Sequence, residues 1–155
     1  ATGFLYQLLN VYARIHELGY VGYEKVMIAL TRNDYEPDVL FFGIEKAAGF
    51  KKGHWKYPAP DFAVEVLSDS TTHRDRGIKF NDYAAHGVAE YWIIDPEDET
   101  IEQYFLLEEQ YKLHLKISEG IIRSTVVEGF AIEVRAVFEE KANLAELRRI
   151  LSEDK

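Results

Sequence analysis

Two short and almost uninterrupted apolar runs constrain the fold of this chain most strongly. They are DVLFFGI at residues 38–44 and DFAVEVL at residues 61–67, and a proline precedes each of them. Runs of this length are typical of strands rather than helices. Because a strand with apolar side chains on both faces must be covered on both faces, the runs predict a sheet with further elements packed on either side.

The rest of the pattern supports a mixed fold. Apolar residues at helical spacing predict helices at 2–18, 72–86 and 137–151. The second helix has Thr72 as its expected N-cap, and the last has Leu144, Leu147, Ile150 and Leu151 on one face. Strands are expected at 20–30, 89–94, 100–106, 110–117 and 121–127, and an irregular segment at 45–60. This order predicts an α/β fold with a central mixed β-sheet flanked by helices, a C-terminal β-meander and a terminal helix.

Length and composition narrow the possible classes of protein. The 155 residues are expected to form one domain, 1–155, and the natural chain is expected to begin earlier because the first residue is not Met. Cysteine is absent, which excludes disulfides, a thiolate zinc site and a cysteine nucleophile. No apolar run is long enough to span a membrane and no signal peptide is visible, so we expect a cytoplasmic protein.

Charge is distributed unevenly along the chain, whose formal net charge is −9. Residues 46–79 carry seven basic and four acidic side chains, whereas residues 1–45 and 80–155 are both acidic. The acidic total argues against nonspecific binding to nucleic acid, because phosphates favour basic partners. The basic middle segment is either a lysine-rich loop in water or a rim that faces phosphate groups around a site.

Two carboxylates stand in strands, where a charge is costly. Asp38 opens the first apolar run and Glu65 lies within the second. Such a group must take up a proton or meet a cation. A divalent ion between the two acids would meet this need, because Mg²⁺ prefers one or two carboxylates with water and phosphate. Asp61 lies about 13 Å from Glu65 along the strand, too far to share one ion.

Simpler interpretations of these acids remain open. Asp38 could face water at the start of its strand, and Glu65 could form a plain salt bridge with Lys79 or Arg76. Those two cations recur with Tyr83 and His86 at spacings of three and four, so all four share a face of the helix at 72–86. If that helix packs beside the strand of Glu65, the Lys79 ammonium group can position a water molecule or stabilise phosphate charge.

Other common active-site patterns are absent from the sequence. No GxSxG motif surrounds Ser68 or Ser70, and helix capping explains the serines and threonines before residue 73 better than a hydrolase with His73 as its base. The five histidines lack the HxxxH and HxH spacings of zinc sites. Neither GxxxxGK[ST] nor GxGxxG occurs. Trp55 either stacks on a nucleic-acid base or packs within its loop.

Three sequence blocks resemble a known family. They are Pro37-Asp38 with the following VLFF, PDFAVEVLSDST at 60–71, and RDRGIKFNDYAAHGVAEYWIIDP at 74–96. Together they resemble the Uma-two family of putative restriction endonucleases, within the PD-(D/E)XK nuclease superfamily, and the likeness runs from about residue 2 to about residue 138. It implies a restriction-endonuclease-like core.

The resemblance also implies site residues. Asp38 matches the Asp of the motif and Glu65 its acidic partner, and the backbone carbonyl of Val66 would be a further metal ligand. The standard pattern has a lysine two residues after the second acid, where this chain has Leu67. In similar superfamily members the lysine has moved to the following helix, where Lys79 matches it. Tyr83 falls in the same block.

These observations predict a Mg²⁺- or Mn²⁺-dependent DNA endonuclease that hydrolyses phosphodiester bonds. Asp38 and Glu65 would hold the metal, Lys79 would orient the attacking water, and Tyr83 would support Lys79 or a phosphate. Phosphate contacts are expected from Lys51, Lys52, Lys56, Arg74 and Arg76. The alternative is a catalytically silent nucleic-acid-binding or oligomeric interaction module on the same fold. The acidic net charge supports it, as does the apolar face of the terminal helix, which could dock on a second copy to form a homodimer.

Overall fold

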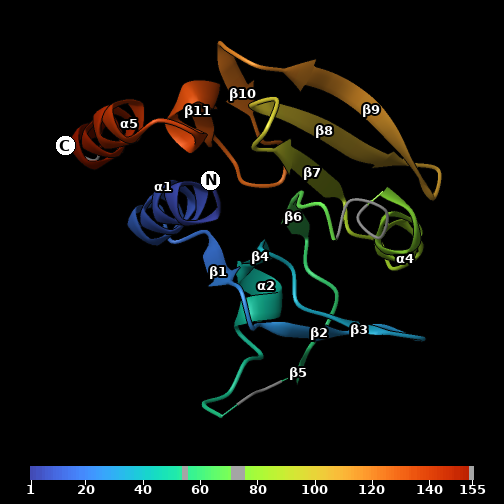
Figure 1. Ribbon diagram of the computed structural model, residues 1–155. Helices are drawn as coiled ribbons and strands as arrows, with labels where there is room; N and C mark the ends of the chain where they lie inside the picture. Colours follow the sequence, from blue (N-terminus) through green and yellow to red (C-terminus); the bar gives the residue numbers. More distant parts are fainter. Residues whose placement is uncertain (54–55, 71–75, 154–155) are drawn as a thin grey trace.

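A six-stranded mixed sheet is the centre of the computed structural model, which describes residues 1–53, 56–70 and 76–153 (Figure 1). The strand order is β1-β4-β6-β7-β8-β9, in which β6 and β7 are parallel and every other neighbouring pair is antiparallel. The strands span Gly19–Tyr23 (β1), Val39–Gly43 (β4), Phe62–Val66 (β6), Glu90–Asp95 (β7), Thr100–Leu107 (β8) and Gln110–Ile117 (β9). The predicted central mixed sheet and the meander β7-β8-β9 are thus confirmed.

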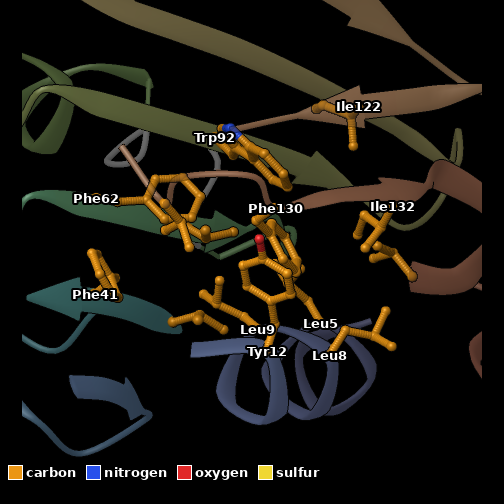
Figure 2. Close-up of a cluster of buried hydrophobic side chains, with 14 of the residues drawn as sticks. Leu5, Leu8, Leu9, Tyr12, Phe41, Phe62, Trp92, Ile122, Phe130 and Ile132 are labelled. Atoms are coloured by element: carbon orange, nitrogen blue, oxygen red, sulfur yellow. The ribbon is translucent and has the colours of Figure 1, made fainter. Parts of the chain in front are cut away.

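One face of the sheet is covered by the two ends of the chain. Figure 1 shows α1 (Thr2–Ile15) and α5 (Glu140–Glu153) side by side on this face. The two-stranded sheet of β10 (Ile121–Arg123) and β11 (Ala131–Glu133) and the 3-10 helix η1 (Val134–Val137) complete the layer. Figure 2 shows the core between them, where Leu5, Leu9 and Tyr12 of α1 lie below Phe62 and Trp92 of the sheet.

The opposite face carries α4 (Ile78–Ala85) and a small sheet. The small sheet has the order β3-β2-β5, with β2 at Met27–Ala29, β3 at Asp34–Tyr35 and β5 at Lys56–Tyr57, and α2 (Ile44–Ala47) follows β4. A second core joins these elements to the sheet through Ile28, Phe42, Tyr83 and Tyr91. Within the described part of the chain, no helix has the length and apolar character needed to cross a membrane.

Several predicted elements are shorter than their apolar pattern. The first helix ends at Ile15 rather than 18. The strand expected at 20–30 is two strands in different sheets, because Glu24 and Lys25 take positive φ values of 41° and 39° between β1 and β2. The segment 45–60, expected to be irregular, contains most of α2 and all of β5. Strands of two or three residues leave too few positions for periodicity to show.

The last part of the chain also differs from the prediction. Of the strand expected at 121–127, only 121–123 is extended in a sheet. The helix expected at 137–151 begins at Glu140, after η1, and its predicted apolar face is only partly buried: Ile150 is 1% exposed, but Leu144 is 44% and Leu151 52% exposed. The helix expected at 72–86 is described from Arg76 onward, so the predicted cap Thr72 lies outside the described residues.

Candidate functional site

Sheet register brings Asp38 next to Glu65. Val39 pairs with Val64, and the Glu24 N–H donates to the Asp38 carbonyl at 3.0 Å, so the ladder of β4 continues back to Asp38. Asp38 therefore stands opposite Glu65, and residues directly opposite each other share a face, with Cα atoms about 5 Å apart. Asp38 Oδ2 also accepts the Val66 N–H at 2.7 Å. Asp38 is a partly buried residue whose carboxylate is held against β6 by this hydrogen bond, so it does not simply face water.

Glu65 is a buried carboxylate with a cation and a phenol on its two oxygens. Glu65 is only 2% exposed. The Lys79 ammonium group donates to Oε2 at 3.1 Å, and the Tyr83 hydroxyl donates to Oε1 at 3.0 Å. Lys79 and Tyr83 are one helical turn apart on α4 and are themselves buried. The structure thus brings together all four residues predicted to be catalytic, from two strands and one helix.

Contacts with the small sheet hold α4 in this position. The Tyr35 ring packs edge-on against Tyr83 with ring centroids 5.5 Å apart. Its hydroxyl donates to the Asp82 carboxylate, and this hydrogen bond is the main reason that the pKa of Asp82 lies below its usual value. At the end of α4, the Thr31 N–H donates to His86 Nε2 at 3.1 Å. The helix therefore presents Lys79 and Tyr83 to the sheet from a fixed position.

Arg76 lies near this cluster but contacts a different acid. Its two terminal guanidinium nitrogens donate to the two oxygens of Glu102 at 2.7 and 2.9 Å. The Tyr104 hydroxyl donates to Glu102 Oε2 at 2.6 Å, and Lys116 Nζ lies 3.7 Å from Oε1. Sequence reasoning missed Glu102, although the signal that identified Glu65, an acid inside an apolar strand, is present in TIEQYFL as well.

These contacts shift the ionisation of the second cluster. Burial alone would raise the pKa of Glu102, but hydrogen bonds from Arg76 and Tyr104 outweigh it and hold the pKa below its usual value. Burial, followed by the hydrogen bond to Glu102, raises the pKa of Tyr104 to about 12. The hydrogen bonds to Glu102 also raise the pKa of Arg76. The cluster is therefore a carboxylate, a guanidinium and a neutral phenol at neutral pH.

The other residues predicted to contact phosphate are spread over the basic segment. Lys51 and Lys52 are exposed, and Lys56 pairs with Asp34 at 2.9 Å. Arg74, with Trp55 and His73, lies outside the described residues. Asp61, which distance along the strand excluded, binds the Gly43 N–H at 2.6 Å and Lys46 at 2.9 Å and so has a structural role.

The donor set fits a hard cation with few protein ligands. Asp38 and Glu65 offer carboxylates on one face of the sheet, and Mg²⁺ is commonly bound through only one or two of these. Among the residues that the structure describes, no group of three or more His, Cys, Asp or Glu side chains could hold a metal. A cavity of about 420 Å³ lies at the ends of β6 and β7. It is lined by Leu67, Ser68, Asp69, Arg76, Asp95, Pro96 and Glu97.

Comparisons with known proteins agree with the fold. The family model Uma2, described as putative restriction endonuclease, matches residues 1–135. Among solved structures, a putative nuclease belonging to DUF820 from Anabaena variabilis superposes with a TM-score of 0.72. The two are 13% identical, and the match covers 94% of this chain and 79% of that one. At this identity the superposition supports the fold alone. No curated protein sequence matches the chain.

Proposed function

Because the chain belongs to the Uma2 family of putative restriction endonucleases, we propose that it is a divalent-metal-dependent DNA endonuclease whose active site is the cluster of Asp38, Glu65, Lys79 and Tyr83. One observation carries the proposal. Two carboxylates from neighbouring strands and an ammonium group from the next helix meet in one place, with Lys79 Nζ 3.1 Å from Glu65. The reaction is hydrolysis of a phosphodiester bond.

Asp38, Glu65 and the main chain of Val66 would hold the cation, Mg²⁺ or Mn²⁺. The N–H and C=O of one strand residue point to the same neighbouring strand, so the Val66 carbonyl faces the strand of Asp38 as its N–H does. Three oxygen donors would leave room for water and a phosphate oxygen. When bound, the cation supplies Lewis acidity that activates water and stabilises charge on the phosphate.

Lys79 would orient the attacking water. The ammonium group binds Glu65 and would also donate to the water oxygen and to a phosphate oxygen once the substrate is bound. Its positive charge would favour the more negative transition state. Tyr83 would fix the second oxygen of Glu65 and so keep the carboxylate oriented.

DNA is the proposed substrate, and its phosphates would meet the basic segment. Lys51, Lys52, Lys56 and Arg74 belong to the one stretch of the sequence with a basic surplus. Lys51 and Lys52 are exposed at the loop between α2 and β5. The acidic remainder of the surface would repel DNA, so binding would be oriented rather than general.

The experiment is the conversion of supercoiled plasmid to nicked circles in Mg²⁺ or Mn²⁺. At a temperature where each variant is folded, Asp38→Asn, Glu65→Gln and Lys79→Met should each lower the rate by about 100-fold or more, since each removes a group proposed to hold the metal or to orient the attacking water. Asp61→Asn is the matched control, an acid behind a proline outside the cluster, and should cleave at the wild-type rate. Equal nicking by all four variants would identify a contaminating nuclease and refute the proposed site.

A second candidate function, an oligomeric interaction module, has one observation in its favour. Leu144 and Leu151 of α5 are about half exposed, and Leu151 lines a mainly apolar hollow with Val11, Arg14 and Ile15 of α1. A second copy of the chain would bury this surface. Sedimentation velocity tests this interface. A wild-type dimer that Leu151→Glu converts to a monomer supports the interface. A wild type that stays monomeric at about 100 µM, above the dissociation constant of most specific dimers, rejects it.

A further inference from the structure

We propose that Arg76 and Glu102 form a positioning pair, which holds the start of α4 on the sheet so that Lys79 stays on Glu65. Arg76 would then act through Lys79 rather than by contacting DNA phosphate. The inference rests on the proposed function for its catalytic consequence. Its structural part, the attachment of α4, is independent of that function.

Glu65 and Glu102, the two acids that bind Lys79 and Arg76, stand in one row across the sheet. Glu65 of β6 pairs with Ile93 of β7, Ile93 pairs with Glu102 of β8, and Glu102 pairs with Lys116 of β9. Neighbouring strands are about 4.8 Å apart, so Glu65 and Glu102 are separated by about 10 Å with Ile93 between them. Arg76 and Lys79 come from one short stretch of chain and reach these two acids. The start of α4 is therefore fixed to the sheet at two points.

Among the described residues, no side chain caps the start of α4. Its N-cap is Gly77, which offers no side chain to the first turn, and no acidic residue lies in that turn. A helix that lacks both features frays at its N-terminus more readily than one with a capping side chain. Arg76 directly precedes this cap. Its planar guanidinium makes two parallel hydrogen bonds, a geometry that restrains direction as well as distance.

The surroundings of Arg76 favour a positioning role over contact with phosphate. Glu102 has an 8% exposed side chain and is fully engaged by Arg76, Tyr104 and Lys116. Removing Arg76 from it would leave a largely buried carboxylate with less compensation. The cavity that Arg76 lines also carries the acids Asp69, Asp95 and Glu97, which repel an incoming phosphate. The positive charge of Arg76 is therefore already balanced by Glu102 in the DNA-free protein.

The kinetic test compares Arg76→Ala with Glu102→Gln in plasmid cleavage. We expect both variants to lower kcat by a similar factor, about 10- to 100-fold, because a small displacement of a catalytic group is that costly. The KM for DNA and the slope of log affinity against log salt should stay at wild-type values. Guanidinium ion at about 20 mM, a non-denaturing level, should not restore Arg76→Ala, because a free ion cannot hold a helix in place.

A phosphate contact predicts the opposite pattern. Arg76→Ala would then raise KM and reduce the salt slope by about one, guanidinium would restore activity, and Glu102→Gln would leave cleavage unchanged or faster. Arg135→Ala is the matched control, because Arg135 also pairs with an acid, Glu99 at 2.9 Å, but lies away from the site. Should Glu102→Gln not fold, Arg76→Lys replaces it. Lysine keeps the charge but loses the two parallel bonds, so its kcat should also fall.

Hydrogen exchange decides the structural part without any cleavage. The Asn81 N–H donates to the Gly77 carbonyl and reports the first turn of α4. Its exchange should be at least about 10-fold faster in Arg76→Ala and in Glu102→Gln, while amides of β7 keep the wild-type rate. Unchanged exchange at residue 81 in both variants would overturn the positioning pair. If the wild type does not cleave DNA but exchange accelerates as expected, the proposed function fails and the attachment of α4 stands.

Discussion

At the scale of single residues, three glutamates buried in the central strands receive three different sets of donors. Glu65 meets an ammonium group and a phenol, and Glu102 meets a guanidinium. Glu90 is fully buried, and its donors among the described residues are neutral, from Trp92, Gln103, Ser124, Thr125 and Val126. The chemistry available to each acid follows from these partners, and Glu65 is the one that lies next to a second carboxylate, Asp38, within the described part of the chain.

Removing the cation from Glu65 should destabilise the fold. Lys79→Met takes the Lys79 ammonium group away from a 2% exposed carboxylate, so we expect the free energy of unfolding to fall by about 3 kcal/mol. Urea denaturation measures it. The double variant Glu65→Leu with Lys79→Met should recover part of this loss, since it leaves no buried charge. A single variant as stable as the wild type would show that the pair is not buried as described.

Glu90→Gln tests whether the sheet face opposite the proposed site needs a carboxylate at this position or only a polar group. Oε2 accepts from Trp92 and Gln103, and Oε1 accepts from residues 124–126. An amide must turn its NH₂ group toward one of these sets of donors, so we expect a loss of about 2 kcal/mol in unfolding free energy. Plasmid cleavage at a temperature where both proteins are folded should be unchanged. A loss of cleavage without a loss of stability would contradict this separation of roles.

Buried acids could be recognised in the sequence, but their partners could not. Asp38 and Glu65 stood out because each lies in an apolar run, and the ladder places them as expected. The sequence alone allows either Lys79 or Arg76 to pair with Glu65, because the two cations share one helix face. The strand register decides between them. It puts Glu102 in the same row, and that pairing depends on a hairpin that lies after α4 in the chain.

At the scale of elements, α4 links the site to the meander, and its attachment should depend on pH. The pKa of Glu102 is lowered in the folded state. Its contribution to stability is therefore present above the ordinary carboxyl pKa and is lost as pH falls through the lowered value. The pKa of Tyr104 is raised to about 12, so its contribution is present below pH 10, roughly its unfolded value, and is lost as pH rises toward 12.

Melting temperatures measured across pH follow both losses of stability, the acidic limb due to Glu102 and the alkaline limb due to Tyr104. Tyr104→Phe should flatten the fall between about pH 10 and 12, because the phenylalanine has no proton to lose. Glu102→Gln should flatten the fall in acid and also reduce the alkaline fall, because the hydrogen bond to Glu102 is part of what raises the pKa of Tyr104. A profile for either variant that parallels the wild type through its own limb would rule out the proposed linkage.

Long elements were predictable and short ones were not. The strands β4, β6, β7, β8 and β9 all fall within one or two residues of their apolar runs. The small sheet of β2, β3 and β5 has strands of two or three residues, and the parallel partner of β2, β5, lies far from it in sequence. Residues 124–126 resemble a strand by composition but bind the Glu90 carboxylate instead. That tertiary contact has no counterpart in local propensity.

At the scale of the whole molecule, the sheet separates two cores with different roles. The core between the sheet and the terminal helices (Figure 2) contains the buried acid Glu90 with neutral donors, whereas the α4 side of the sheet contains the row of Glu65 and Glu102 with their cations. The site thus lies on the face opposite the chain ends. Uneven charge adds a second asymmetry, with the basic surplus confined to residues 46–79.

Charge reversal in the basic segment should weaken DNA binding. Lys51→Glu with Lys52→Glu changes two exposed side chains far from Glu65 in sequence. We expect the affinity for a labelled duplex at low salt to fall about 10-fold or more, and the salt slope to fall by about two. Lys141→Glu with Arg148→Glu changes the charge by the same amount at exposed positions of α5 and serves as the comparison. An equal effect of both pairs would show that net charge, not a defined surface, governs binding.

Diffraction from crystals soaked in Mn²⁺, recorded for its anomalous signal, tests the central claim most directly. Asp38 directly precedes β4, and its carboxylate binds the Val66 N–H next to Glu65, so the account predicts one strong peak within about 2.3 Å of an oxygen from each carboxylate. The peak should disappear in Asp38→Asn crystals. No peak between these two acids, or a peak that the substitution leaves in place, would contradict the account.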